Sequence, residues 1–138
     1  MSEEQEQFNQ AFGEHTGISE DCRYDMNCIK NNQPNVNELN MRLSDTSYFT
    51  DLSWRLLGRY IANNNQLEKV DLLCCGITDE IMVSLFRELT YSTSLNHLDL
   101  SGNSSFGIEG IRSMIPFLQN SPNLSSIGFN GHKLRPYR

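Results

Sequence analysis

The residues of this sequence with the clearest capacity for chemistry are His97, the aspartates Asp71 and Asp99, and Cys74. A thiol, an imidazole and a carboxylate can form a nucleophilic triad, in which the imidazole takes the proton of the attacking thiol and the carboxylate orients the imidazole. Such a triad needs a pocket that excludes water and donors that stabilise an oxyanion. The spacing around these residues instead predicts an open, solvated sheet surface, so we do not predict an enzyme.

The cysteines offer a second kind of site. Cys22 and Cys28 are separated by five residues, whereas Cys74 and Cys75 are adjacent, and this spacing does not match a zinc site. Adjacent cysteines in a protein of a reducing compartment are expected to be free thiols rather than a disulfide framework. Phosphate-binding loops and the HExxH, GxSxG and kinase signatures are absent from the sequence. We therefore predict no cofactor and no metal site.

The spacing of large apolar residues shows which elements carry these side chains. In the stretch LNHLDLSGN, Leu95, Leu98 and Leu100 are followed by Asn103. The same spacing recurs 28 positions earlier and 29 positions later, in the sets Leu67, Val70, Leu72, Cys75 and Leu124, Ile127, Phe129, His132. A weaker first copy is Val36, Leu39, Met41. A constant period in this range indicates a repeat architecture.

Apolar triplets with helical spacing lie between these stretches, each ending six positions before the next stretch begins. The triplets are Trp54, Leu57, Ile61; Met82, Leu85, Leu89; and Ile111, Met114, Leu118. Each triplet marks one apolar face of a helix. The first helix is expected over about residues 51–62, after Thr50 or Asp51, and the second after Thr78 as its N-cap. The third should begin near Ile108 and be kinked or short, because Pro116 interrupts helical hydrogen bonding.

The repeat resembles that of leucine-rich repeat proteins of the ribonuclease-inhibitor-like type, whose repeats are 28 to 29 residues long and contain a full α-helix. The resemblance covers residues 36–132. It implies an α/β solenoid of about three to four repeats, with short parallel strands on the concave side and helices on the convex side. Strands are expected near residues 39–41, 70–72, 98–100 and 127–129. The turn positions after them should form a ladder of Ser44, Cys75, Asn103 and His132.

The chain is expected to divide into three parts. Residues 35–132 form the leucine-rich repeat domain. Residues 1–34 are acidic and lack the repeat spacing; they form either a flexible arm or a partial cap, built by residues 18–29, over the hydrophobic end of the first repeat. Residues 133–138 are a short basic tail.

Charge and hydropathy limit the partners. The net charge is −6 and the basic residues are scattered, which argues against binding to nucleic acid. No apolar run is long enough to span a bilayer, and the N-terminus has no signal peptide. We expect no membrane association and a cytoplasmic protein, with a nuclear location as the alternative.

Outward side chains of stacked strands line up in rows on the concave face. We predict a protein-binding surface there, made of Lys69, Asp71, Leu73, His97, Asp99, Ser101, Ser126 and Asn130. Asp71 and Asp99 fall in the same row, so the partner is expected to present a basic surface. This interpretation makes the chain an intracellular protein-protein interaction module.

The last strand offers an alternative docking site. A parallel edge strand with apolar neighbours attracts another chain unless it is covered. The predicted docking residues are Ile127, Phe129 and Leu134, which would serve self-association or continuation of the solenoid. Under this alternative, the chain is a structural piece of a larger solenoid or of a multi-subunit assembly. The sequence leaves open whether the chain is a fragment of a longer repeat protein.

Overall fold

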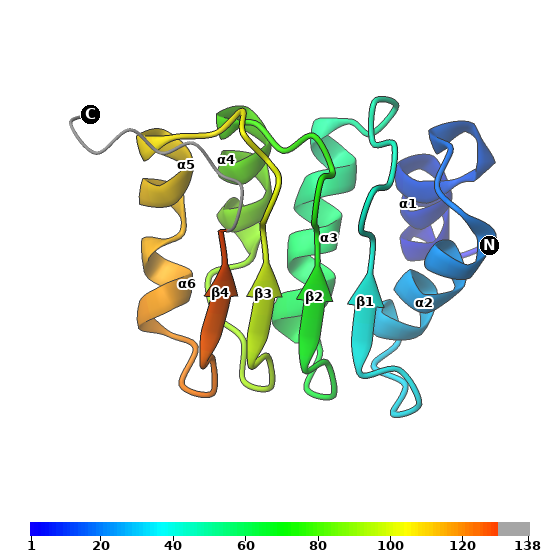
Figure 1. The fold of residues 1–138 in the computed structure, drawn as a ribbon. Coiled ribbons are helices and arrows are strands. Elements are labelled where there is room, and N and C mark those ends of the chain that lie inside the picture. Colours follow the sequence, from blue (N-terminus) through cyan, green and yellow to red (C-terminus); the bar gives the residue numbers. More distant parts are fainter. Residues whose placement is uncertain (130–138) are drawn as a thin grey trace.

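Helices and strands alternate along most of the chain (Figure 1). The computed structural model describes residues 1–129 of the 138. Its elements are α1 (Glu3–Phe12), a 3-10 helix (Glu14–Thr16), α2 (Glu20–Lys30), β1 (Glu38–Asn40), α3 (Asp51–Asn63), β2 (Lys69–Asp71), α4 (Asp79–Glu88), β3 (His97–Asp99), α5 (Ile108–Ser113), α6 (Ile115–Gln119) and β4 (Ser126–Gly128).

The four strands form one parallel sheet in the order β1-β2-β3-β4. Each strand begins one residue before the predicted position, which is within the usual uncertainty of element ends. Every connection between neighbouring strands contains a helix, as parallel pairing requires. The predicted α/β solenoid is thus confirmed.

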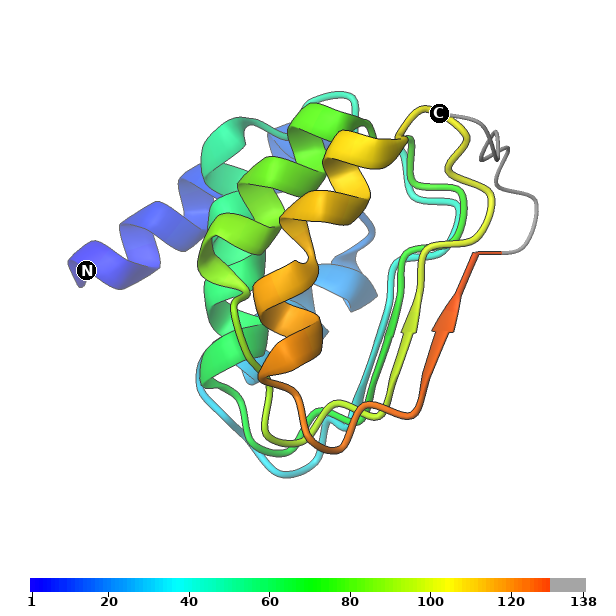
Figure 2. The ribbon, with the colours of Figure 1, turned by 90° about the vertical axis from the view of Figure 1, so that its left-hand side faces the viewer.

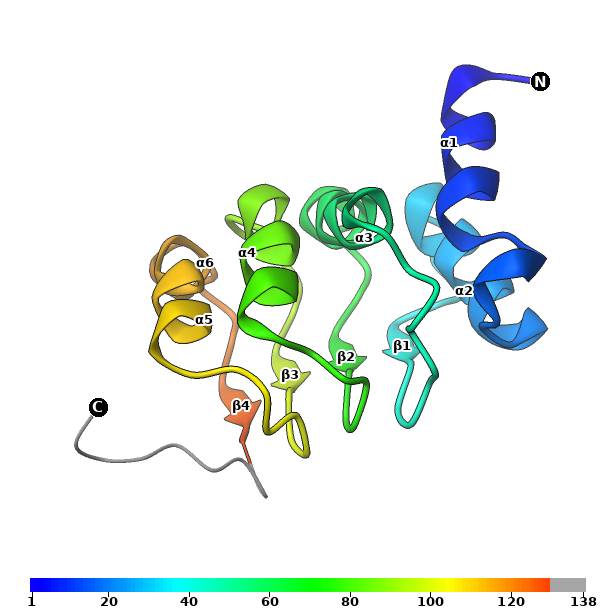
Figure 3. The same ribbon diagram turned by 90° about the horizontal axis from the view of Figure 1, so that it is seen from above.

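The helices and the strands make two layers. Figure 2 shows the helices on one face of the sheet, and within the described chain no helix covers the other face. Paired strands lie about 4.8 Å apart, whereas packed helices need about 8–10 Å. The strand row is therefore the shorter one, and the view from above shows it on the inner side of the curve (Figure 3).

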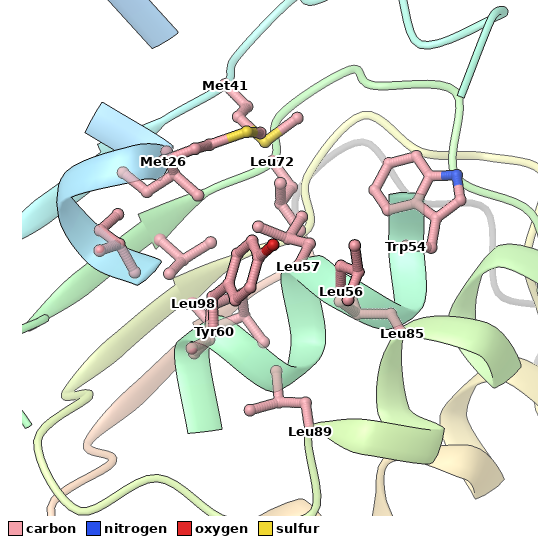
Figure 4. Close-up of a cluster of buried hydrophobic side chains, with 14 of the residues drawn as sticks. Met26, Met41, Trp54, Leu56, Leu57, Tyr60, Leu72, Leu85, Leu89 and Leu98 are labelled. Atoms are coloured by element: carbon pink, nitrogen blue, oxygen red, sulfur yellow. The ribbon is translucent and has the colours of Figure 1, made fainter. Parts of the chain in front are cut away.

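The core lies between the two layers (Figure 4). Leu98 of β3 and Leu72, directly after β2, point into it from the sheet, and Leu57, Leu85 and Leu89 meet them from α3, α4 and the end of α4. All five side chains are fully buried or nearly so. The apolar spacing of the sequence therefore predicted this part of the core correctly.

The helix starts follow from side-chain capping. Thr50 and Ser53 form a capping box at α3, in which each side chain accepts from the other's backbone N–H. Thr78 caps α4 by accepting from the backbone of Ile81. Both caps satisfy backbone donors that the first turn of a helix leaves free. The predicted starts are confirmed.

The third predicted helix is interrupted. α5 ends at Ser113 and α6 begins at Ile115, with Pro116 in its first turn, where a missing N–H does no harm. The break changes which residues face the core: Phe117 is fully buried, whereas Leu118 is 42% exposed. The prediction of an inward Leu118 was therefore wrong, because it assumed a continuous helix.

Two residues of the predicted ladder, Asn103 and Cys75, hold the turns that follow the strands. The Asn103 amide accepts from the backbone N–H of Cys75 at 2.9 Å and donates to the Leu72 carbonyl at 2.9 Å, so it connects two repeats. In the preceding repeat, the Cys75 thiol takes this place and donates to the Met41 carbonyl at 2.9 Å. His132, the last predicted member, lies outside the described residues.

Two helices cover the end of the solenoid beside β1. Phe8 and Phe12 of α1 are buried against Tyr60, with ring centroids 6.3 Å and 6.1 Å away. Met26 and Ile29 of α2 belong to the same core. The covering segment extends from α1 through α2, beyond the range of residues 18–29 expected to act as a cap.

Candidate protein-interaction face

The strands pair in register, so their outward side chains form rows across the bare face of the sheet. The first row is Glu38, Lys69, His97 and Ser126. The second row is Asn40, Asp71, Asp99 and Gly128. These are the rows that the repeat period predicted.

Side chains of the first row remain accessible. Lys69 Nζ lies 3.7 Å from Glu38 Oε1, and each side chain is a little under half exposed. His97 Nδ1 and Ser126 Oγ are 2.5 Å apart, so these two form a hydrogen-bonded pair. An ion pair this exposed contributes little to folding, which leaves both partners free to rearrange on binding.

The second row has a structural role that the sequence did not reveal. One carboxylate oxygen of Asp71 accepts from the backbone N–H of Leu73 at 3.0 Å, and Asp99 does the same with Ser101 at 2.8 Å. Asn40 repeats this contact in the first repeat. A side chain that accepts from the backbone two residues later forms a local turn, so this row bends the chain at the strand ends.

Asp71 is therefore not a free acidic group on the surface. Its residue is only 3% exposed, and its second oxygen lies 3.7 Å from Arg42 Nε. The continuous acidic strip expected from the sequence is reduced to Asp99, which is half-buried. The physical reason is that a carboxylate at the end of a strand accepts a hydrogen bond from a backbone N–H of the following turn, so this oxygen is no longer available to a partner protein.

Asp99 keeps its charge at neutral pH. Partial burial raises the pKa of this carboxyl, but the hydrogen bonds from Ser101 and the charges of His97 and Arg42 outweigh the burial, so the pKa lies below its ordinary value. The bare face thus presents charges of both signs.

A third row lies two residues beyond the second, and its side chains differ in how accessible they are. Arg42 is exposed and Leu73 is half-buried, whereas Ser101 is only 5% exposed. Asn130, the last predicted member, lies outside the described residues. Lys69, His97, Asp99 and Ser126 are thus the predicted site residues that the structure brings together with accessible polar groups.

The structure does not assemble the nucleophilic triad considered from the sequence. The ring of His97 is hydrogen bonded to Ser126, and Asp71 is engaged by the turn after β2. Cys74 lies on that turn with its sulfur against Gly102, where an added Cβ would be 2.3 Å from Sγ. Among the described residues, no group of three or more metal-ligating side chains is gathered in one place.

A pocket at the edge of the sheet was not predicted. It has a volume of about 590 Å³ and lies between the loop after β1 and the first half of α4. Its walls include Phe49, Trp54 and Glu80. The apolar spacing of the sequence places Trp54 in the core, and loop residues carry no periodic signal, so the sequence does not indicate this pocket.

The far edge of the sheet is formed by β4. Ile127 and Phe129 are partly buried against the core, and the Phe129 ring lies 6.4 Å from that of Phe106. Leu134, the third predicted docking residue, lies outside the described residues. On α6, Ile115 and Leu118 are exposed.

No helix in residues 1–129 is long and apolar enough to cross a membrane.

Comparison with known proteins supports the architecture. Residues 63–86 and 91–114 match the family described as Leucine Rich repeat. The chain matches none of the curated proteins. It is similar to the solved structure of leiomodin-1 actin-binding site 2, with a TM-score of 0.67 and 19% sequence identity. The similarity covers 80% of this chain and 62% of that one, and at this identity it concerns the fold alone.

Proposed function

Because this chain is a leucine-rich repeat protein of the ribonuclease-inhibitor-like type, we propose that it is a binding module that holds a protein partner on the bare face of its sheet. The observation that carries this proposal is the one-sided covering of a parallel sheet. Parallel sheets are usually covered on both faces, and here the helices cover only one (Figure 2). The other face carries a polar row that is accessible to a partner.

The charges of this face describe the partner. Lys69 and Arg42 are exposed cations, Glu38 is an exposed carboxylate, and Asp99 remains ionised. A partner surface with both signs of charge complements this pattern better than the purely basic surface expected from the sequence. His97 and Ser126 add hydrogen-bonding groups in the half of the row that β3 and β4 form.

The proposal also concerns location. The described chain has four free cysteines, three of them buried. Free thiols of this kind suit a reducing compartment, so we propose that the module works inside the cell.

The test compares charge changes on the two sides of the solenoid. We expect the double variant Lys69→Glu, His97→Ala to lose at least tenfold in affinity for a partner captured by the parent protein, as measured by calorimetry. The control Arg112→Glu makes the same charge change on α5, where this arginine is 65% exposed. Equal affinity of the double variant and the parent would show that the partner binds elsewhere.

A second candidate is docking through the end of the solenoid, where Ile115 and Leu118 are exposed on the last helix beside the edge strand β4. Apolar side chains at the end of a solenoid favour a further repeat or another subunit. Light scattering over a concentration series tests this role. Ile115→Glu with Leu118→Glu should reduce self-association, and a parent protein that stays monomeric at high concentration would exclude self-docking.

A further inference from the structure

The pocket at the edge of the sheet is a second site, separate from the rows of the bare face. It is lined by the loop after β1, the first turn of α3, the turn after β2 and the first half of α4. Its volume of about 590 Å³ falls in the range of binding pockets for small ligands and single side chains.

The floor of the pocket is aromatic. The rings of Phe49 and Trp54 meet edge to face, with centroids 5.2 Å apart. Trp54 is only 3% exposed, yet its indole N–H has no hydrogen-bond acceptor among residues 1–129. Figure 4 shows the indole nitrogen on the side of the ring that faces away from the hydrophobic cluster. The nitrogen is not one of the buried polar atoms that lack a partner in the described chain, so it opens to the pocket and can donate to an acceptor from outside.

The charged side chains of the pocket wall are all acidic: Asp45, Asp51 and Glu80. Asp51 is already neutralised by Arg55 at 2.7 Å and bonded by Ser84. Asp45 accepts from the backbone N–H of Ser47, which lowers the pKa of its carboxyl and keeps it charged.

Glu80 lies in the first turn of α4, is exposed, and has no ion-pair partner within the described chain. Asp45 and Glu80 therefore leave two uncompensated negative charges beside the aromatic floor.

We propose that this pocket binds a lysine or arginine side chain from an extended segment of a partner protein. The aliphatic stem packs on the ring of Phe49, which is only partly buried, as long basic side chains pack on apolar surfaces. The cationic head is paired by the carboxylates of Asp45 and Glu80. The partner's backbone carbonyl accepts the open indole N–H of Trp54. The proposal is independent of binding on the bare face, since the two sites share no residue.

Trp54 allows a direct test, because it is the single tryptophan of the sequence and gives one indole N–H signal in a nitrogen-15 NMR spectrum. The probes are blocked pentapeptides of glycine with a central arginine, lysine, citrulline or glutamate. We expect saturable shifts of the indole signal with arginine and lysine. Citrulline and glutamate, which lack the positive charge, should bind at least tenfold more weakly.

The variants separate binding from folding. Asp45→Asn keeps the hydrogen bond to Ser47, and Glu80→Gln keeps the helix, so the double variant should fold and lose the response to arginine at least tenfold. Glu109→Gln removes an exposed carboxylate outside the pocket, on α5, and should leave the response unchanged. Equal shifts with citrulline and arginine, or no saturable shift up to about 10 mM probe, a level that would still detect millimolar affinity, would overturn the proposal.

Discussion

A single amide, that of Asn103, holds the turns of two adjacent repeats together. Besides Cys75 and Leu72, it accepts from the backbone N–H of Ile77 at 3.1 Å and donates to the carbonyl of Leu100 at 3.0 Å. The residue is only 1% exposed, so these backbone groups have no water as a substitute. Each buried group left without a partner costs about 1–3 kcal/mol.

We therefore expect Asn103→Ala to lower the free energy of unfolding by about 3–5 kcal/mol. The measurement is urea unfolding followed by circular dichroism. The control is Asn123→Ala, because Asn123 also donates to a backbone carbonyl, that of Thr93, but is exposed. This variant should lose less than about 1 kcal/mol. Similar losses in both variants would mean that the ladder amide adds nothing beyond an ordinary surface bond.

Buried thiols make stability depend on alkaline pH. Burial raises the pKa of Cys22 to about 12 and that of Cys75 to about 11, from 9.0 for a free thiol. The folded state thus holds these protons more tightly than the unfolded state does. The stability that these protons contribute is fully present below pH 9 and is lost as the pH rises from there to the folded-state values, at most by about 1.4 kcal/mol per pH unit for each thiol.

The check is unfolding by urea at several pH values between 9 and 10. Cys22→Ala should be less stable at every pH, but between pH 9 and 10 it should lose about 1 kcal/mol less stability than the parent, since the unfolded-state thiol ionises over this range. A slope identical to that of the parent would show that Cys22 does not titrate as its burial requires.

For single residues, the repeat period predicted the rows of the sheet. It did not predict which side chains of a row are exposed and which are buried or bonded to the backbone. Asp71 and Asp99 share a row, as predicted. The burial of Asp71 and its bond to the turn depend on Arg42 and Leu73, which come from two different repeats. Contacts of this kind follow from three-dimensional packing, so the spacing of leucines does not contain them.

At the scale of elements, the helices that obeyed a simple period were predicted well. Caps at Thr50 and Thr78 gave the correct starts, because a hydroxyl before an apolar triplet is a local signal. Pro116 correctly predicted that the third helix is interrupted. It did not predict which side chains of α6 face the core after the interruption. Which side chain becomes buried after a break depends on the angle at which the helix resumes, and here Phe117 rather than Leu118 was placed inside.

Close packing of α3 on α4 depends on Gly58. A Cβ added at this position would lie 2.3 Å from the backbone oxygen of Leu85 and 3.2 Å from the nitrogen of Leu89. Backbone atoms of a packed helix do not yield as a flexible side chain would. We expect Gly58→Ala to destabilise the protein by about 1–3 kcal/mol, although alanine favours an isolated helix by about 1 kcal/mol.

The matched control is Gly107→Ala, since a Cβ there meets no atom within 4 Å. Because Gly107 is the N-cap of α5 and alanine is a poorer cap than glycine, this variant should lose about 0.5–1 kcal/mol, less than Gly58→Ala. Thermal unfolding of both variants decides the matter. A stabilised Gly58→Ala would show that the two helices can separate at little cost.

At the scale of the whole molecule, the N-terminal helices were the least predictable part. Phe8 and Phe12 are spaced for one helix face, but the surrounding polar residues make a helix there marginal on its own. Helices of this length are stabilised by packing rather than by their own sequence. The partners of α1, including Phe49 and Tyr60, lie in the first repeat, far away in the sequence.

We propose that residues 1–34 act as the N-terminal cap of the solenoid. The contacts extend beyond the aromatic rings: the Ser53 hydroxyl donates to the backbone of Ala11 at 2.8 Å, and the Asn64 amide donates to that of Ile29 at 3.1 Å. Both donors belong to α3 or its end. A solenoid with so few repeats is stabilised mainly by contacts between neighbouring units, so loss of a cap should weaken the whole chain.

The last prediction follows from this coupling. Phe12 is fully buried between Phe8, Phe49 and Tyr60, and Phe12→Ala should cost about 3–5 kcal/mol, as for other buried phenylalanines cut to alanine. Because the cap and the repeats share one core, unfolding should remain a single transition with a lower midpoint, and hydrogen exchange should become faster even in β3. Tyr24→Ala, at a 61% exposed position of α2, should change the midpoint little. Two separate transitions, or unchanged exchange in β3, would show instead that the N-terminal helices fold apart from the repeats.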